Sequence, residues 1–165
     1  SIAREQAENT GWTSDTPGTV EYQKELYNNL YKAISSKKSF LSDRALSCVA
    51  AYTFMHALNN PDDKKLKKLA DSQYKKFCKF HNDNPNVIIV YTPIEFPVEY
   101  DGLRSTNEKE RTNIDFLIKN ILDTTGANCI TVTGTVEERL AQIKNKINFK
   151  LTSNRKIPTH ATIPR

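Results

Sequence analysis

The sequence predicts an α/β fold in which a parallel sheet carries helices on both of its faces. The first observation is that the runs NVIIVY (86–91) and NCITVTG (128–134) are apolar on both faces, which is typical of buried parallel strands. The second is that a segment with helical spacing of apolar residues follows each run. Strands that alternate with helices in this way indicate βαβ units.

Length and composition limit the class of protein. The 165 residues suit one domain with a real core. No apolar run reaches the roughly 18–20 residues of a membrane helix, so no membrane location is expected. Three cysteines lie far apart without metal-ligand spacing, and we interpret them as buried thiols of a reducing compartment such as the cytoplasm.

The first half of the chain is expected to form one strand and three helices. A tyrosine-rich helical stripe at 19–34 precedes a short apolar run, SFLSD (39–43), which we predict as a strand. The segment 44–58 is apolar almost all round, so its helix should be buried on most sides. Asn60 and Pro61 are then expected to cap and open a surface helix.

In the second half, two helix starts carry a capping-box pattern. Ser105 with Glu108 and Thr135 with Glu138 have the spacing in which each residue of a pair binds the other's backbone N–H. Helical apolar stripes follow both pairs, at Ile114, Leu117, Ile118 and Ile121 and at Val136, Leu140, Ile143 and Ile147. We therefore expect a capped helix after each of the last two strands.

The chain has 24 basic and 19 acidic residues and a formal charge of +5. Its lysines cluster in DDKKLKKLADSQYKK, which is more simply the solvated face of a helix than a nucleic-acid interface. The same positive charge would also favour the binding of nucleotides, which are small polyanions. Residues 151–165 lose helical periodicity, so we divide the chain into a domain at 1–150 and a basic tail at 151–165.

Candidate functional residues follow the predicted strands. Asp43 and Arg44 come after the first, the stretch from Glu95 to Arg111 after the second, and Thr133-Gly134-Thr135 after the third. Ligands of open parallel sheets bind beyond the carboxyl ends of the strands. An acid, arginines and a small-residue turn at that edge indicate phosphoryl transfer.

The stretch EFPVEYDGLRSTNEKER (95–111) has two interpretations. As a glycine-hinged lid, it would close Arg104 and Arg111 over bound phosphates and neutralise charge in the transition state. The alternative is that Asp101, Glu108 and Glu110 pair with these arginines at the surface.

Four blocks resemble a known family in their order and spacing: SIAREQAENTGW, FLSDRALSCVAAYTF, VIIVYTPIEFPVEYDGLRSTNEKERTNIDFLI and CITVTGTVEERLAQI. The chain is similar to small P-loop kinase-like ATPases, which are common in bacteriophages and often labelled AAA-domain proteins. These are similar to ribosylnicotinamide kinase and to deoxynucleoside and thymidylate kinases. The resemblance implies a three-layer P-loop fold and phosphoryl transfer from ATP with Mg²⁺.

The resemblance also implies roles for matched residues. Arg4 would face the substrate, Gln23 and Tyr27 would line its pocket, and Asp43 and Arg44 would contact the phosphoryl acceptor. Arg104 and Arg111 would be catalytic lid arginines. Thr133, Gly134 and Thr135 would hold the adenine of ATP, and no residue is assigned as a metal ligand.

One part of the family pattern is not within these residues. A phosphate loop needs Gly-Lys-Ser/Thr, and none of the five glycines is followed by lysine. Only three strands are visible, and the chain starts at Ser1, so we expect the first strand and phosphate loop upstream, with no kinase activity without them. The expected function is a nucleoside or nucleotide kinase or a related ATPase. The alternative is a non-catalytic structural or interaction protein of a larger complex or homo-oligomer.

The remaining candidates are histidines. His56 stands in the apolar segment 44–58 and is expected to be a core or boundary residue. His81 ends the lysine-rich helix, where a protonated imidazole would interact favourably with the helix dipole.

Overall fold

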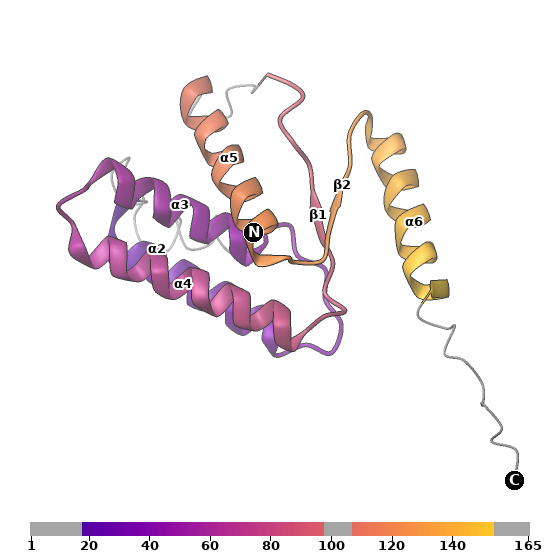
Figure 1. Cartoon of the computed structure of the whole chain (residues 1–165), viewed down its shortest axis with the longest axis horizontal. Coiled ribbons are helices and arrows are strands. Elements are labelled where there is room, and N and C mark those ends of the chain that lie inside the picture. The colour runs from indigo at the N-terminus through magenta and orange to yellow at the C-terminus, as the bar shows by residue number, and fades with distance from the viewer. Residues whose placement is uncertain (1–17, 98–106, 154–165) are drawn as a thin grey trace, which may run out of the picture.

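The computed structural model describes residues 18–97 and 107–153 of the chain. The elements in this part, shown in Figure 1, are α2 (Val20–Ser35), α3 (Leu46–Asn59), α4 (Lys64–Asp83), β1 (Ile89–Tyr91), α5 (Glu108–Thr125), β2 (Cys129–Thr131) and α6 (Val136–Ser153). They form an α/β arrangement in which helices predominate.

The two strands pair in parallel. Ile89 lies opposite Cys129, Val90 opposite Ile130 and Tyr91 opposite Thr131, and α5 is the connection between the strands. In Figure 1 the pair lies between the group α2–α5 and the separate helix α6. The prediction that 86–91 and 128–134 contain parallel neighbouring strands is confirmed.

The predicted strand at 39–43 is wrong. These residues form an irregular connection between α2 and α3, and the side chains of Phe40 and Leu41 are 38% and 101% exposed. A strand needs a neighbour that takes up its N–H and C=O groups, and no described segment pairs with 39–43. The described part of the sheet therefore has two strands instead of three.

The core lies between α2, α3, α4, α5 and β1. The helix at α3 is buried on most sides, as its apolar sequence predicts, and it runs between α2, α4 and α5. Tyr91 of β1 donates a hydrogen bond to Asp115 Oδ1 of α5 at 2.8 Å, which ties the strand to the helix. The core residues are Tyr27, Leu30, Ile34, Leu46, Val49, Ala50, Ala51, Phe77, Phe80, Ile89, Tyr91, Ile121 and Leu122.

The predicted apolar stripe of α6 is only partly covered. Val136 and Leu140 are 67% and 51% exposed, whereas Ile130 and Val132 in and just after β2 are buried. Lys146 Nζ donates to the Thr131 carbonyl oxygen at 3.2 Å, so this part of α6 lies beside the end of β2. Two short strands give α6 too little sheet surface to cover its whole stripe.

Two predicted helix caps differ from the observed ones. The Asp63 side chain accepts from two backbone N–H groups at the start of α4, while Asn60 closes the end of α3. Asn107 caps α5 in the same way, and Ser105 lies outside the described residues. Aspartate and asparagine accept these bonds as well as serine does, so the spacing pattern alone does not select the cap.

The proposed domain boundary at 150 falls within α6, which continues to Ser153. Residues 1–17 and 154–165 lie outside the described part. The three cysteines are partly buried free thiols. In the described ranges, no helix is long and apolar enough to cross a membrane.

Candidate functional site

A cluster of polar contacts joins the carboxyl ends of the two strands. Glu95, four residues after β1, accepts hydrogen bonds from the Gly134 N–H at 3.1 Å through both carboxylate oxygens. The same carboxylate accepts from the Arg139 guanidinium at 2.6 Å. Glu95 therefore connects the segment after β1 with the first turns of α6.

The turn between β2 and α6 is built by a capping box. Gly134 has a φ of 89°, a value that favours glycine. The Thr135 N–H donates to Glu138 Oε2 at 2.7 Å, and the Glu138 N–H donates to Thr135 Oγ1 at 3.3 Å. The predicted capping box of Thr135 and Glu138 is confirmed, and it fixes where α6 begins.

Gln142 of α6 binds the backbone of Thr133, the residue before Gly134. Its side-chain Nε2 donates to the Thr133 carbonyl oxygen at 2.8 Å, and its Oε1 accepts from the Thr133 N–H at 3.4 Å. Side chains of α6 therefore bind the backbone of Thr133 and Thr135, whereas Glu95 binds that of Gly134.

Arg139 is held from two directions. Its guanidinium carbon lies 5.6 Å from the centre of the Phe96 ring, a favourable cation–π distance. Its side chain is 23% exposed, and Nε is buried without a hydrogen-bond partner in the described part of the chain. Glu95 and Phe96 together fix the guanidinium beside the turn.

Arg111 is engaged in the first turn of α5. It pairs with Glu108 at 2.6 Å and donates to the Phe96 carbonyl oxygen at 3.0 Å. The ion pair with Glu108 is the one that the alternative interpretation of this stretch predicts. Arg104 lies outside the described residues.

Among the described residues, no hydrogen bond or ion pair joins Asp43 or Arg44 to the Glu95 cluster. Both are exposed in the bend before α3, and the N-cap residue Ala45 makes no side-chain hydrogen bond. Burial raises the pKa of Tyr22, and the positive charge of Arg44 opposes this rise. Arg44 thus lies close to α2, at the amino end of α3.

The proposed pocket residues Gln23 and Tyr27 lie inside the helical group, 2% and 1% exposed. Gln23 Oε1 accepts from Thr53 at 3.0 Å, and Gln73 Nε2 donates to the Gln23 carbonyl oxygen at 3.0 Å. The Tyr27 hydroxyl donates to the Gln73 carbonyl oxygen at 2.9 Å. In this conformation both residues join helices, and Arg4 lies outside the described residues.

The residues predicted from the sequence lie at the strand ends, but they do not include Glu95, Phe96 or Arg139 in any named role. Glu95 has a detectable signal, because it is the acid that follows an apolar strand at the edge where ligands bind. Arg139 is one helical turn beyond Thr135, on a helix that opens at the same edge. No group of three or more potential metal ligands occurs in residues 18–97 and 107–153.

Residues 2–139 match the model of a protein family described as an AAA domain. The chain belongs to the AAA domain family. The matched part of the AAA domain ends at Arg139, so it includes Glu95 and the Gly134 turn. Membership supports an ATP-binding protein of the P-loop class and is compatible with the α/β arrangement of strands and helices. No curated protein and no solved structure matches the chain.

Proposed function

We propose that this protein transfers a phosphoryl group from ATP to a nucleoside or nucleotide. The observation that carries the proposal is that the AAA family match spans a parallel strand pair and a glycine turn opening a capped helix at its carboxyl edge. Nucleotides bind at this edge in open α/β sheets.

The turn at Thr133, Gly134 and Thr135 suits the adenine base better than a phosphate. Two of its three backbone N–H groups already donate to carboxylates, Gly134 to Glu95 and Thr135 to Glu138. A phosphate would meet these two negative charges, whereas an uncharged base would not. The proposal therefore puts the base at this turn and the phosphates toward the rest of the carboxyl edge.

The acceptor is proposed to lie at Asp43 and Arg44. Both precede α3, whose first N–H groups receive no bond from the side chain of its N-cap residue. The helix amino end and Arg44 would attract the phosphate of a nucleotide acceptor, whereas the Asp43 carboxylate would repel it. Asp43 would accept the proton of the attacking group.

We assign to Arg104 the role of neutralising the negative charge that develops in the transition state. Arg111 is held by Glu108 and by the Phe96 carbonyl group, so its guanidinium is already paired at the start of α5. ATP and Mg²⁺ are implied by the family, and the proposal names no phosphate loop and no metal ligand among these 165 residues.

The proposal is tested by assaying the full-length protein with ATP and a panel of nucleosides and nucleoside monophosphates. Arg104→Ala should lower kcat by about 10²–10³-fold, because the charge that it neutralises is largest in the transition state. The Kd for ATP should change little. Lys109→Ala, which removes an exposed cation at the start of α5, is the matched control and should leave kcat unchanged.

The second candidate function does not involve phosphoryl transfer. In that case the fold serves as a non-catalytic structural or interaction protein. Absence of both phosphoryl transfer and ATP hydrolysis in the assay would replace the kinase proposal with this one. Full activity of Arg104→Ala would remove only the lid role.

A further inference from the structure

The excess positive charge of the chain is concentrated in one helix. Of its 24 basic and 19 acidic residues, seven lysines and two aspartates lie in α4. The helix thus has a formal charge of +5, and the other residues, with 17 of each sign, sum to zero. The net positive charge of the chain therefore resides on this helix, where it can attract a polyanion.

Four of these lysines form a stripe along the exposed side of α4, defined as Lys64, Lys68, Lys75 and Lys79. Their spacings of four and seven residues put them within a sector of about 60° on the helix and over a length of about 22 Å. All four are exposed. The opposite side of the helix, with Leu66, Ala70, Phe77 and Phe80, is buried in the core.

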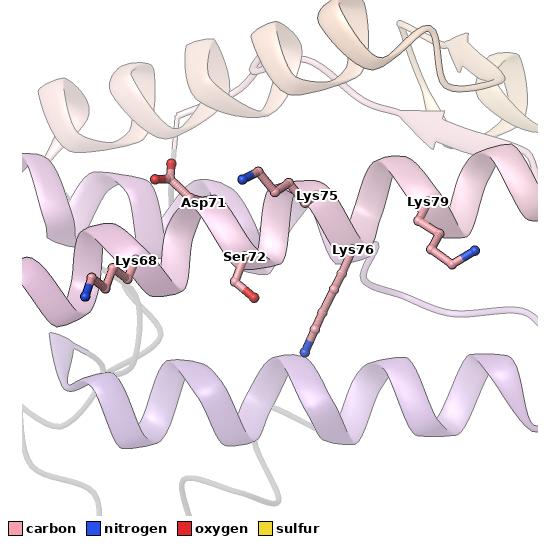
Figure 2. A pocket seen from close by; sticks show the side chains of 6 residues that line it. All are labelled: Lys68, Asp71, Ser72, Lys75, Lys76 and Lys79. Carbon is pink, nitrogen blue, oxygen red and sulfur yellow. The ribbon is translucent and has the colours of Figure 1, made fainter.

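A shallow hollow of about 530 Å³ lies on this side of the helix. It is lined by Lys68, Asp71, Ser72, Lys75, Lys76 and Lys79, and in Figure 2 the Lys76 side chain extends from α4 toward α2. Among the described residues, Lys79 is the stripe lysine that forms an ion pair. Its partner is Asp83, at 2.8 Å, and the pair is exposed. Among the described residues, Lys64, Lys68 and Lys75 thus have no ion pair, and Asp71 is the acid on the same side of the helix.

We propose that the lysine stripe of α4 binds the phosphate backbone of a nucleic-acid duplex without reading its sequence. A duplex has one negative charge per roughly 1.7 Å of axis, so a 22 Å line of lysines can contact several phosphates. The stripe contains no aromatic ring on which a single-stranded base could stack. It contains no apolar side chain that could enter a membrane interface. This inference rests on charge and geometry and is independent of the proposed kinase activity.

The test measures binding of the full chain to a fluorescein-labelled 24-base-pair DNA duplex of arbitrary sequence by fluorescence anisotropy. Four lysine–phosphate contacts predict that log K falls against log salt with a slope of about −3.6. Affinity should then drop roughly 150-fold between 50 and 200 mM salt. An RNA duplex of the same length should bind similarly, because the contacts are to phosphates.

The decisive variant is Lys68→Gln/Lys75→Gln/Lys79→Gln. It should bind at least about tenfold more weakly at 50 mM salt, with a slope near −1, since about one unit of slope is lost with each phosphate contact. The matched control Lys24→Gln/Lys109→Gln/Lys144→Gln removes the same charge from exposed lysines of α2, α5 and α6. It should keep most of the slope.

Three results would overturn the proposal. The first is no binding of either duplex at 50 mM salt, and the second is an equal loss in both triple variants. The third is binding to vesicles of 30% phosphatidylserine in phosphatidylcholine that the stripe variant abolishes, without duplex binding, which would assign the stripe to a membrane surface. Circular dichroism melting of each variant checks folding, and these exposed substitutions should leave Tm nearly unchanged.

Discussion

Glu95 is the residue on which the geometry of the carboxyl edge depends most. Its carboxylate binds a backbone N–H 39 residues away and a guanidinium 44 residues away, and its side chain is 26% exposed. Hydrogen bonds to a charged group contribute more than neutral ones. This residue therefore stabilises the contact between the segment after β1 and the start of α6.

We expect Glu95→Gln to lower the free energy of unfolding by about 1–2 kcal/mol. The amide removes the negative charge, leaving the partly buried Arg139 guanidinium without its ionic partner. Urea denaturation measures the change. Glu108→Gln is the matched control, because it breaks an ion pair whose acid is 63% exposed, and it should cost less than about 1 kcal/mol. Equal losses in the two variants would contradict a special role for Glu95.

The Glu95 contact shows why the site could be predicted only in part. The strands and the Thr135 capping box depend on residues close together in sequence, and both were recognised from spacing. Whether Glu95 meets Arg139 depends on the register of two parallel strands and on the direction of α6, which local patterns do not encode. Gln23 and Tyr27 likewise joined the helical core because of how α2, α3 and α4 pack together.

At the scale of elements, two glycines end or begin helices in different surroundings. Gly126 closes α5 with a φ of 61°, and an added Cβ there would meet no atom within 4 Å. Gly134 precedes α6 with a φ of 89°, and an added Cβ would collide with the Glu138 carboxylate. Backbone conformation thus restricts both positions, while the second is restricted by the capping box as well.

Gly134→Ala should therefore destabilise the protein more than Gly126→Ala. We expect about 1 kcal/mol for Gly126→Ala, the cost of a left-handed conformation without glycine. For Gly134→Ala we expect about 2–3 kcal/mol, since Glu138 must also leave the Thr135 N–H. Thermal unfolding of both variants gives the comparison. A larger loss for Gly126→Ala would show that the capping box adds no constraint.

The failed strand at 39–43 illustrates a limit at the same scale. Its apolar sequence resembles the strands at 89–91 and 129–131, but a strand forms through a neighbour and not through its own pattern. β1 and β2 are each other's neighbours. Each strand therefore has the partner that it needs, and both predictions are confirmed. The surface caps Asp63 and Asn107 differ from expectation because several nearby side chains can serve as acceptors.

At the scale of the whole molecule, two histidines link stability to pH. Burial lowers the pKa of His56 in α3 and of His81 in α4, although Glu110 partly opposes the shift at His56. His81 packs edge-on against Phe77 at 4.6 Å between ring centres. The helix dipole, which was expected to favour protonated His81, acts in the opposite direction to burial.

The sign of the effect follows from proton binding. Near pH 6.5 the histidines of the unfolded chain bind protons, whereas the buried ones in the folded chain bind fewer. The free energy of unfolding should therefore decrease as pH falls below about 6.5 and stop decreasing below the lowered folded pKa. Urea denaturation between pH 7.5 and 5.5 measures this decrease, in a range where carboxylates contribute little.

The double variant His56→Gln/His81→Gln should show a flatter pH dependence than the natural chain, because glutamine does not titrate. Proton NMR of the imidazole rings provides an independent readout, in which His81 should titrate below its usual pKa of about 6.5. If His81 titrated above that value, the helix dipole would outweigh burial. Stability would then rise, and not fall, as His81 becomes protonated on acidification, and packing of the imidazole against Phe77 would have to be compatible with its charge.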